Sequence, residues 1–190
     1  MKIGVLAVQG AFIEHEKMLK KLGADCVELR SKNDIKDLDG IVLPGGESTV
    51  QGKLLRELEM FLPLKDLIEK GIPVLATCAG SILLSEEISN DKNVYFGTLP
   101  VTIQRNAYGR QSGSFSCKGD VASFKDVEMT FIRAPFFEKI NSSEVEVIAE
   151  VENKIVGVKY KNQIALAFHP ELTSDTRLHE MFLKMIKEKK

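Results

Sequence analysis

The sequence predicts an α/β fold, a three-layer sandwich in which helices flank a mostly parallel central sheet, with a smaller antiparallel β portion in the second half. Three observations support this prediction. The first half follows the order β-α-β-β-α-β, and its strand segments are apolar almost throughout, which is typical of a parallel sheet covered on both faces. The second half contains short strand-like segments joined by turn residues, a spacing that favours hairpins. The C-terminal segment has the pattern of a helix.

In the first half, apolar segments rich in β-branched residues alternate with amphipathic ones. Gly23 and Gly71 follow two of the amphipathic segments, and glycine is the preferred residue just after a helix. Pro73 opens the last strand of this half, which ends before Cys78. The expected strands are residues 3–8, 26–29, 40–44 and 73–77, and the expected helices are residues 12–22, 50–60, 61–69 and 81–87.

The second half predicts antiparallel pairing. Its expected strands are residues 94–97, 100–104, 114–117, 128–132, 145–151, 155–160 and 163–168, with turns at 152–154 and 161–162. The last strand is apolar throughout, so we expect it to return to the central sheet. A terminal helix is expected over residues 173–189, with Thr173 or Ser174 as its N-cap. Repeats, linkers and low-complexity segments are absent from the sequence, which predicts a single domain over residues 1–190.

Composition narrows the classes of function. The chain of 190 residues has a net charge of −1, with 44% hydrophobic and 28% charged residues, which is ordinary for a soluble globular protein. A near-neutral charge does not indicate a nucleic-acid partner or an electrostatic membrane anchor. The sequence has no apolar stretch near the ~20 residues of a membrane span and no secretory signal pattern. We therefore expect a cytoplasmic location.

Cys78 is the strongest single candidate for a catalytic residue. It lies where an apolar strand meets a small-residue turn and a helical segment, so its thiol is expected beside the N–H groups of a helix N-terminus, where a thiolate is favoured. A strand-to-helix turn of this kind is typical of a catalytic nucleophile, although a buried structural cysteine has the same local sequence pattern. Cys26 and Cys117 lie in strand-like segments and are expected to be small core residues. The wide spacing of the three cysteines does not indicate a disulfide framework or a zinc site.

Polar features follow three of the expected parallel strands. Gly45 to Ser48 follow the third strand, Cys78 the fourth, and His169 to Glu171 the last, and ligands of open parallel sheets gather at such carboxyl ends. The Gly-Gly pair can aim N–H groups at a developing oxyanion, or it can be a plain turn after Pro44. Glu171 can accept a hydrogen bond from one nitrogen of His169 while the other faces Cys78, or the motif can be a surface turn.

The remaining candidates are weaker when each is taken alone. Arg105 and Arg133 lie at expected strand ends, where an arginine can bind a carboxylate in bidentate fashion, although most single arginines are exposed cations. His15 and His179 lie on expected helices without partners at metal-ligand spacing, so we interpret them as solvated or packed residues and expect no metal site.

Taken together, these segments resemble class I glutamine amidotransferases, and more narrowly the glutaminase subunits of pyridoxal 5′-phosphate synthases. The Cys78 turn and the His-Pro-Glu motif are typical of class I glutamine amidotransferases in general, and the other segments are typical of the glutaminase subunits. The resemblance spans nearly the whole chain, and the residues that carry it are 4–10, 43–49, 77–80, 105–106, 109–111, 131–135 and 168–172.

The resemblance implies roles for particular residues. Cys78 is expected to be the nucleophile, His169 the general base and acid, and Glu171 the group that orients the histidine. The implied glutamine-binding residues are Gly46, Glu47, Ser48, Arg105, Ile132 and Arg133, and the implied oxyanion donors are the backbone N–H groups of Gly46 and Ala79. Ala76 departs from the family pattern, which usually has glycine there, and an alanine would be strained if that position required a positive φ.

By the same resemblance, the chain hydrolyses L-glutamine through a Cys thioester. The ammonia goes to a partner synthase subunit that makes pyridoxal 5′-phosphate, so the expected assembly is a hetero-oligomer and no cofactor is expected on this chain. Two other readings stay open from the sequence. One is a γ-glutamyl or other Cys-dependent hydrolase that needs no partner, and the other is a non-catalytic binding subunit on the same scaffold.

Overall fold

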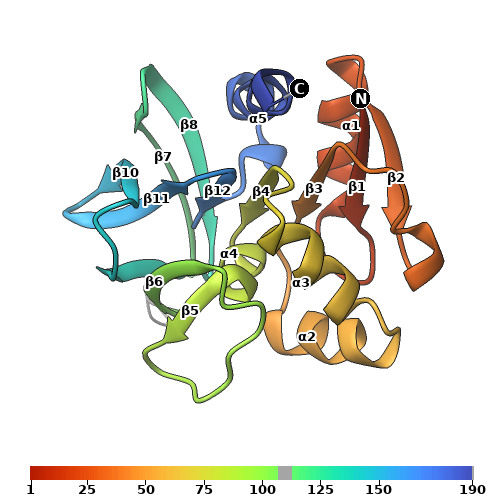
Figure 1. Ribbon diagram of the computed structural model, residues 1–190. Coiled ribbons are helices and arrows are strands. Elements are labelled where there is room, and N and C mark those ends of the chain that lie inside the picture. The colour runs from red at the N-terminus through yellow and green to blue at the C-terminus, as the bar shows by residue number, and fades with distance from the viewer. Residues whose placement is uncertain (107–112, 190) are drawn as a thin grey trace.

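The computed structural model describes residues 1–106 and 113–189. Within this part of the chain, one sheet holds ten strands in the order β2-β1-β3-β4-β12-β11-β9-β6-β5, with β10 paired to β11 (Figure 1). Its strands are β1 Lys2–Leu6, β2 Asp25–Leu29, β3 Gly40–Leu43, β4 Val74–Thr77, β5 Ser85–Ile88, β6 Leu99–Gln104, β9 Phe136–Ile140, β10 Glu146–Val151, β11 Lys154–Tyr160 and β12 Gln163–Leu166.

The first four strands and β12 form the parallel part of this sheet. Each of β2, β1, β3, β4 and β12 runs parallel to its neighbours among these strands, and β12 inserts next to β4 with Ala165 opposite Ala76. Strands β1, β3, β4 and β12 are buried on both faces, which explains why they are apolar almost throughout, whereas the edge strand β2 is half-exposed. The predicted α/β fold is therefore confirmed, as is the return of the last strand to the central sheet. Because β3, β4 and β12 are adjacent and parallel, their carboxyl ends share one edge.

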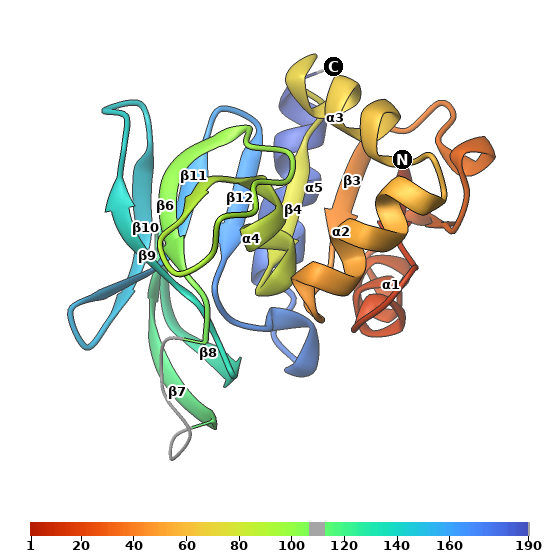
Figure 2. The same ribbon diagram turned by 90° about the horizontal axis from the view of Figure 1, so that it is seen from below.

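Helices cover both faces of the parallel strands. Helices α1 and α5 lie on one side of the sheet, whereas α2 and α3 lie on the other (Figure 1), and α4 joins α2 and α3 on that second side (Figure 2). None of the helices in the described ranges is long and apolar enough to cross a membrane. The helices are α1 Phe12–Lys21, α2 Ser48–Glu57, α3 Phe61–Glu69, α4 Ala79–Leu84 and α5 Arg177–Lys189, with 3-10 turns η1 Lys32–Asp34 and η2 Pro170–Leu172.

The second half is built from hairpins, as its spacing predicts. Strands β7 (Ser114–Val121) and β8 (Phe124–Ile132) form a separate two-stranded antiparallel sheet. Both expected tight turns are present. Glu152 and Asn153 have positive φ between β10 and β11, and Lys161 has a positive φ between β11 and β12. These turns lead the chain from the antiparallel part back to the central sheet.

Two expected elements are wrong, and two strands, β5 and β9, were not expected. The helix expected over residues 81–87 ends at Leu84, because Ser85–Ile88 pairs with β6 as strand β5. The Ser85 hydroxyl donates to the carbonyl of Ser81 at 2.8 Å where the chain leaves the helix. Tertiary pairing thus overrides the helical propensity of the two glutamates. Residues 94–97 form an irregular loop instead of a strand, and β9 (Phe136–Ile140) carried no clear sequence signal.

The terminal helix begins later than expected. Helix α5 starts at Arg177, so neither Thr173 nor Ser174 is its N-cap. The Thr173 hydroxyl instead donates to the carbonyl of Pro170 at 3.0 Å and accepts from the N–H of Asp175 at 3.1 Å. These bonds stabilise the turn that connects η2 to α5, a local use of threonine that competes with capping.

Candidate active site

Cys78 occupies a sharp turn between β4 and α4. Its backbone has φ 46° and ψ −103°, an uncommon conformation for a residue with a side chain. The Cys78 N–H donates to the carbonyl of Leu166 at 2.8 Å, and the Ser81 hydroxyl donates to the same carbonyl at 2.7 Å. Strand β12 therefore holds the turn from the side. Such a backbone costs on the order of 1–3 kcal/mol and persists only where the surroundings enforce it.

The turn at Cys78 requires a small residue at Gly80 and does not require glycine at Ala76. Ala76 lies in strand β4 with an extended backbone, so it carries no strain from a positive φ. The positive φ belongs to Cys78 itself. A Cβ atom on Gly80 would lie 2.0 Å from the carbonyl oxygen of Leu43, which leaves room only for glycine where α4 passes the end of β3. Alanine at position 76 is therefore compatible with the turn.

His169 and Glu171 meet as the sequence predicts. The Nδ1 atom of His169 lies 2.7 Å from Oε1 of Glu171, and both side chains are buried. Residues 170–172 form the 3-10 turn η2, so the pair meets across a turn and not along an extended strand end. The backbone N–H of His169 donates to the carbonyl of Thr130 on β8 at 2.8 Å. The motif is thus a buried hydrogen-bonded pair and not a surface turn.

The side chain of Cys78 also acts on the imidazole of His169. Burial alone would lower the pKa of His169, but the hydrogen bonds and charges of Cys78 and Glu171 outweigh it and raise the pKa to about 10. Burial likewise opposes the charged form of Glu171, yet His15 and His169 lower the pKa of this carboxyl below its usual range. The arrangement favours an imidazolium between two groups that stabilise its charge. A positively charged imidazole beside a cysteine is the arrangement found in Cys-His nucleophiles.

Gly45 brings the glycine loop against the histidine. A Cβ atom on Gly45 would lie 2.2 Å from Cε1 of His169, so only glycine fits at this position. The loop is fixed by Gln9, whose Oε1 accepts from the N–H of Glu47 at 2.8 Å, and by Thr77, whose hydroxyl accepts from the N–H of Gly45 at 3.0 Å. The expected convergence of the three strand ends on one edge is confirmed by these contacts.

Glu47 and Arg105 form an ion pair beside the loop. Arg105 donates from NH2 to Oε1 of Glu47 at 2.9 Å and from NH1 to Oδ2 of Asp91 at 2.6 Å. The Glu47 carboxylate also accepts from the N–H groups of Thr49 and Val50, which begins α2 two residues earlier than expected. Burial opposes ionisation of Glu47, but these hydrogen bonds and Arg105 hold its pKa below the usual value. The guanidinium is thus presented in a fixed orientation.

The other expected binding residues are spread around this centre. Ser48 is buried at the start of α2, and its hydroxyl has no hydrogen-bond partner among the described residues. Ile132 ends β8 and is exposed, and Arg133 follows it with a φ of 43° and donates its N–H to the carbonyl of Gly113. The expected segment 109–111 lies outside the described residues.

Sequence reasoning missed four residues of the site. Asp91 lies in a loop whose only signal is a run of turn residues, and Thr77 precedes Cys78 in an apolar strand. His15 and His179 are fully buried, so the interpretation of them as packed residues is confirmed and the solvated alternative is wrong. Within the described ranges, no group of three His, Cys, Asp or Glu side chains could hold a metal ion.

Burial of His179 makes folding sensitive to acid. Burial, with a smaller effect of His15, lowers the pKa of His179 to about 3, against the opposing charges of Glu171 and Asp175. Below the ordinary value of 6.5 the unfolded chain binds a proton that the folded chain does not, so stability present above pH 6.5 is lost as the pH falls toward 3. We expect unfolding free energy to fall by about 1 kcal/mol between pH 6 and pH 5. Urea titrations should show a smaller fall in His179→Leu, and equal falls would contradict the prediction.

Comparison with known proteins identifies close relatives. A pyridoxal 5′-phosphate synthase subunit PdxT of Desulfitobacterium hafniense strain Y51 is 59% identical over 191 residues, covering 100% of this chain and 96% of the relative. The PdxT subunit of Streptococcus pneumoniae strain CGSP14 is 48% identical over 194 residues and is covered completely, as is this chain.

Solved structures of glutamine amidotransferases resemble this structure as well. A crystal structure of a glutamine amidotransferase has a TM-score of 0.92 and 40% identity, over 97% of this chain and 98% of that one. PurLQS from Thermotoga maritima matches with a TM-score of 0.64 at 17% identity, which shows the fold alone. The model of the SNO glutamine amidotransferase family matches residues 5–188. With the Cys78 turn, a buried His-Glu pair and a glycine loop at one sheet edge, the chain belongs to the SNO glutamine amidotransferase family.

Proposed function

We propose that the chain is the glutaminase subunit of a pyridoxal 5′-phosphate synthase, which hydrolyses L-glutamine and supplies the ammonia to the synthase subunit. The observation that supports this most directly is the series Cys78, His169 and Glu171 at the carboxyl ends of adjacent parallel strands, in which Glu171 hydrogen-bonds to His169 and Cys78 raises the pKa of His169. Family membership and the PdxT relatives support the substrate and the partner. The series also argues against a non-catalytic binding subunit, which has no need of a cysteine held beside a buried His-Glu pair.

Acylation starts at the Cys78 sulfur. The thiolate attacks the side-chain amide carbon of glutamine, and the carbonyl electrons move to the oxygen. We assign the resulting oxyanion to the backbone N–H groups of Gly46 and Ala79. Ala79 is the first residue of α4, so its N–H has no acceptor within the helix. When the tetrahedral intermediate collapses, the imidazolium of His169 protonates the leaving nitrogen, and ammonia and a thioester are formed.

Deacylation reverses the roles of the same groups. Neutral His169 removes a proton from water, and the hydroxide attacks the thioester carbon. The second tetrahedral intermediate expels the Cys78 thiolate, which releases glutamate and restores the thiolate-imidazolium pair. Glu171 stays ionised in both steps and orients the ring through the 2.7 Å contact between its Oε1 and Nδ1 of His169.

Arg105 is assigned to the α-carboxylate of glutamine. Glu47, Ser48, Ile132 and Arg133 complete the proposed binding set, by their positions in the family pattern. Two carboxylates already fix the guanidinium of Arg105, so little conformational freedom is lost when a substrate binds.

We expect Arg105→Ala to raise the KM for glutamine about 10- to 100-fold, because a charge-assisted hydrogen bond contributes ~1.5–3 kcal/mol. The change in kcat should be smaller, since the reacting carbon is distant from the α-carboxylate. Ammonia release over a range of glutamine concentrations measures both constants. Arg177→Ala is a matched control, because Arg177 also pairs with a carboxylate, that of Asp175, but away from this site. A KM that is unchanged in Arg105→Ala would remove Arg105 from the binding set.

The test of the proposed function is glutamine hydrolysis measured with and without the synthase subunit. We expect ammonia release to rise when the pair is mixed, and pyridoxal 5′-phosphate to form from sugar phosphates and glutamine only in the mixture. Turnover that is full without the synthase and unaffected by it would favour the alternative, a Cys-dependent γ-glutamyl hydrolase. The absence of hydrolysis in both cases would favour a non-catalytic subunit.

A further inference from the structure

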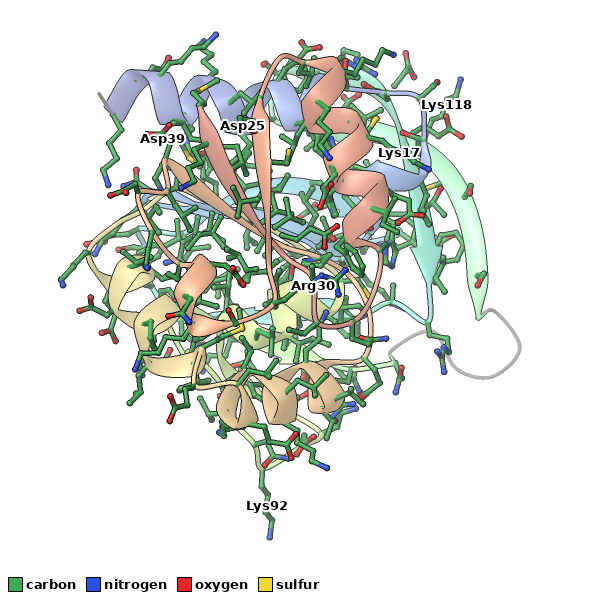
Figure 3. The ribbon with its side chains drawn as sticks, turned by 90° about the vertical axis from the view of Figure 1, so that its right-hand side faces the viewer. Lys17, Asp25, Arg30, Asp39, Lys92 and Lys118 are labelled. Atoms are coloured by element: carbon green, nitrogen blue, oxygen red, sulfur yellow. The ribbon has the colours of Figure 1, made fainter. Side chains whose placement is uncertain are left out.

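The three histidines of this chain lie in one buried network, although only His169 has a part in the chemistry above. His15 lies on α1 and His179 on α5, and both are completely buried. The two helices lie on the same side of the sheet, as the views in Figures 1 and 3 show. Burying two imidazoles among apolar side chains is unfavourable unless their nitrogens are hydrogen-bonded. Their contacts therefore decide what this pair does.

His15 joins the pair to the proposed catalytic carboxylate. Its Nε2 atom lies 3.3 Å from Oε2 of Glu171, the oxygen that does not contact His169, and 3.1 Å from the hydroxyl of Thr77. Its Nδ1 atom lies 2.9 Å from Nε2 of His179. The same Thr77 hydroxyl accepts from the N–H of Gly45, so His15 also touches the anchor of the glycine loop.

The positions of the protons follow from these contacts. If His15 carried its proton on Nδ1, its bare Nε2 would face a carboxylate oxygen, and two lone pairs would meet. His179 would then accept at Nε2 and carry its proton on Nδ1, which has no partner among the described residues. A buried N–H without an acceptor is costly. The alternative arrangement avoids both problems. His179 donates from Nε2 to Nδ1 of His15, and the N–H on Nε2 of His15 donates to the Thr77 hydroxyl and lies 3.3 Å from Oε2 of Glu171.

We propose that His15 is a positioning residue for the reaction, held in its Nε2–H tautomer by His179 so that it fixes the second oxygen of Glu171. The inference rests on the proposed function, because it assigns an outer layer to the same catalytic series. One oxygen of Glu171 is then hydrogen-bonded to His169, and the other is in electrostatic contact with the N–H of His15 at 3.3 Å. The two contacts oppose rotation of the carboxylate away from the imidazole that it orients, and the glycine loop is linked to His15 through the Thr77 hydroxyl.

Long-range ¹H–¹⁵N correlation spectra of the full chain test the proton positions directly. Because the chain has only three histidines, each ring can be assigned by substitution of the other two. We expect His15 to carry a proton on Nε2 and none on Nδ1, and His179 to carry its proton on Nε2. A proton on Nδ1 of His15, in a neutral or a doubly protonated ring, would overturn the proposal. This readout does not depend on glutaminase activity, so it separates a failure of this inference from a failure of the proposed function.

Kinetics with the synthase subunit present test the positioning role. His15→Leu removes the donor, and we expect kcat to fall about 10- to 100-fold with KM for glutamine changed by less than about threefold, as for a displaced catalytic group. His15→Gln keeps an N–H near the position of Nε2 and should recover most of the loss. Leu19→Ala is the control for packing, since Leu19 is buried one turn further along α1. It should lower the melting temperature and leave kcat unchanged.

Two outcomes would refute the positioning role. One is a folded His15→Leu protein with kcat within threefold of the wild type, and the other is a His15→Gln protein as slow as His15→Leu. If His15→Leu does not fold, His179→Leu replaces it, because it removes the donor to His15 without touching Glu171. The His15 ring should then populate both tautomers in the spectra, and an unchanged single tautomer would refute the role assigned to His179.

Discussion

Replacing Cys78 with alanine is expected to lower kcat for glutamine hydrolysis about 10⁴- to 10⁶-fold, even with the synthase subunit present. Without the sulfur there is no thioester, and the remaining groups can only assist direct attack by water. The oxyanion donors and the binding residues stay in place, so binding of glutamine should change little. Ammonia release under saturating glutamine measures the loss, and calorimetric titration measures binding. Ammonia release near the wild-type rate would eliminate Cys78 as the nucleophile.

The two other cysteines provide matched controls. Burial, with a smaller contribution from Glu16, raises the pKa of the Cys26 thiol to about 11, and burial also raises the pKa of Cys117. Both are therefore poor sources of thiolate near neutral pH. Cys26→Ala and Cys117→Ala should each keep the wild-type kcat. Iodoacetamide at pH 7 should inactivate the wild type by alkylating Cys78 first, which peptide mass spectrometry can locate.

Replacing Glu171 with glutamine is expected to lower kcat about 10³- to 10⁴-fold. A carboxylate can only accept hydrogen bonds, whereas a glutamine side chain can turn its NH₂ group toward Nδ1 of His169. The imidazole would then be held in the wrong tautomer, and this change alone costs about 10⁴-fold in the comparable Ser-His-Asp triad. The imidazolium would also lose the negative charge that raises its pKa. Single-turnover measurements with saturating glutamine isolate the acylation step, where we expect the largest effect.

Glu16→Gln is the matched control for this substitution. Glu16 is a second buried glutamate, and it pairs with Lys20 at 2.6 Å instead of contacting a histidine. The two variants make the same change from carboxylate to amide, so a loss confined to Glu171→Gln is due to the triad. A Glu171→Gln protein that keeps kcat within tenfold of the wild type would show that Glu171 does not orient His169.

The proposed catalytic centre could be predicted because each of its parts is marked locally. Strands β3, β4 and β12 are apolar and end at abrupt polar or small residues, so Gly45, Cys78 and His169 could each be placed at a strand end. The rule that parallel strands share a carboxyl edge then brings these ends together. The sequence pattern is therefore sufficient wherever local chemistry and sheet topology together determine the position of a side chain.

Other parts of the structure depend on contacts that leave no local pattern. His15 and His179 are separated by 164 positions and meet only because α1 and α5 pack on the same face of the sheet. Asp91 reaches Arg105 from a polar loop that has no periodicity. Strand β5 contains residues typical of a helix and is extended because β6 offers backbone partners. In each case a tertiary contact decides the structure, and one sequence does not reveal which distant segment supplies it.

The backbone of Cys78 also bears on how this protein can be stabilised. Glycine has no Cβ atom and adopts φ 46° and ψ −103° with less steric strain than cysteine does. A chain with Cys78→Gly should therefore be more stable to unfolding, but it would lose the reactive thiol. Selection for thermal stability alone would therefore favour glycine at position 78 and yield a protein without glutaminase activity. Engineering for heat resistance should exclude position 78 and start from exposed positive-φ residues outside the proposed site, such as Asp37 and Glu59, because glycine adopts a positive φ readily.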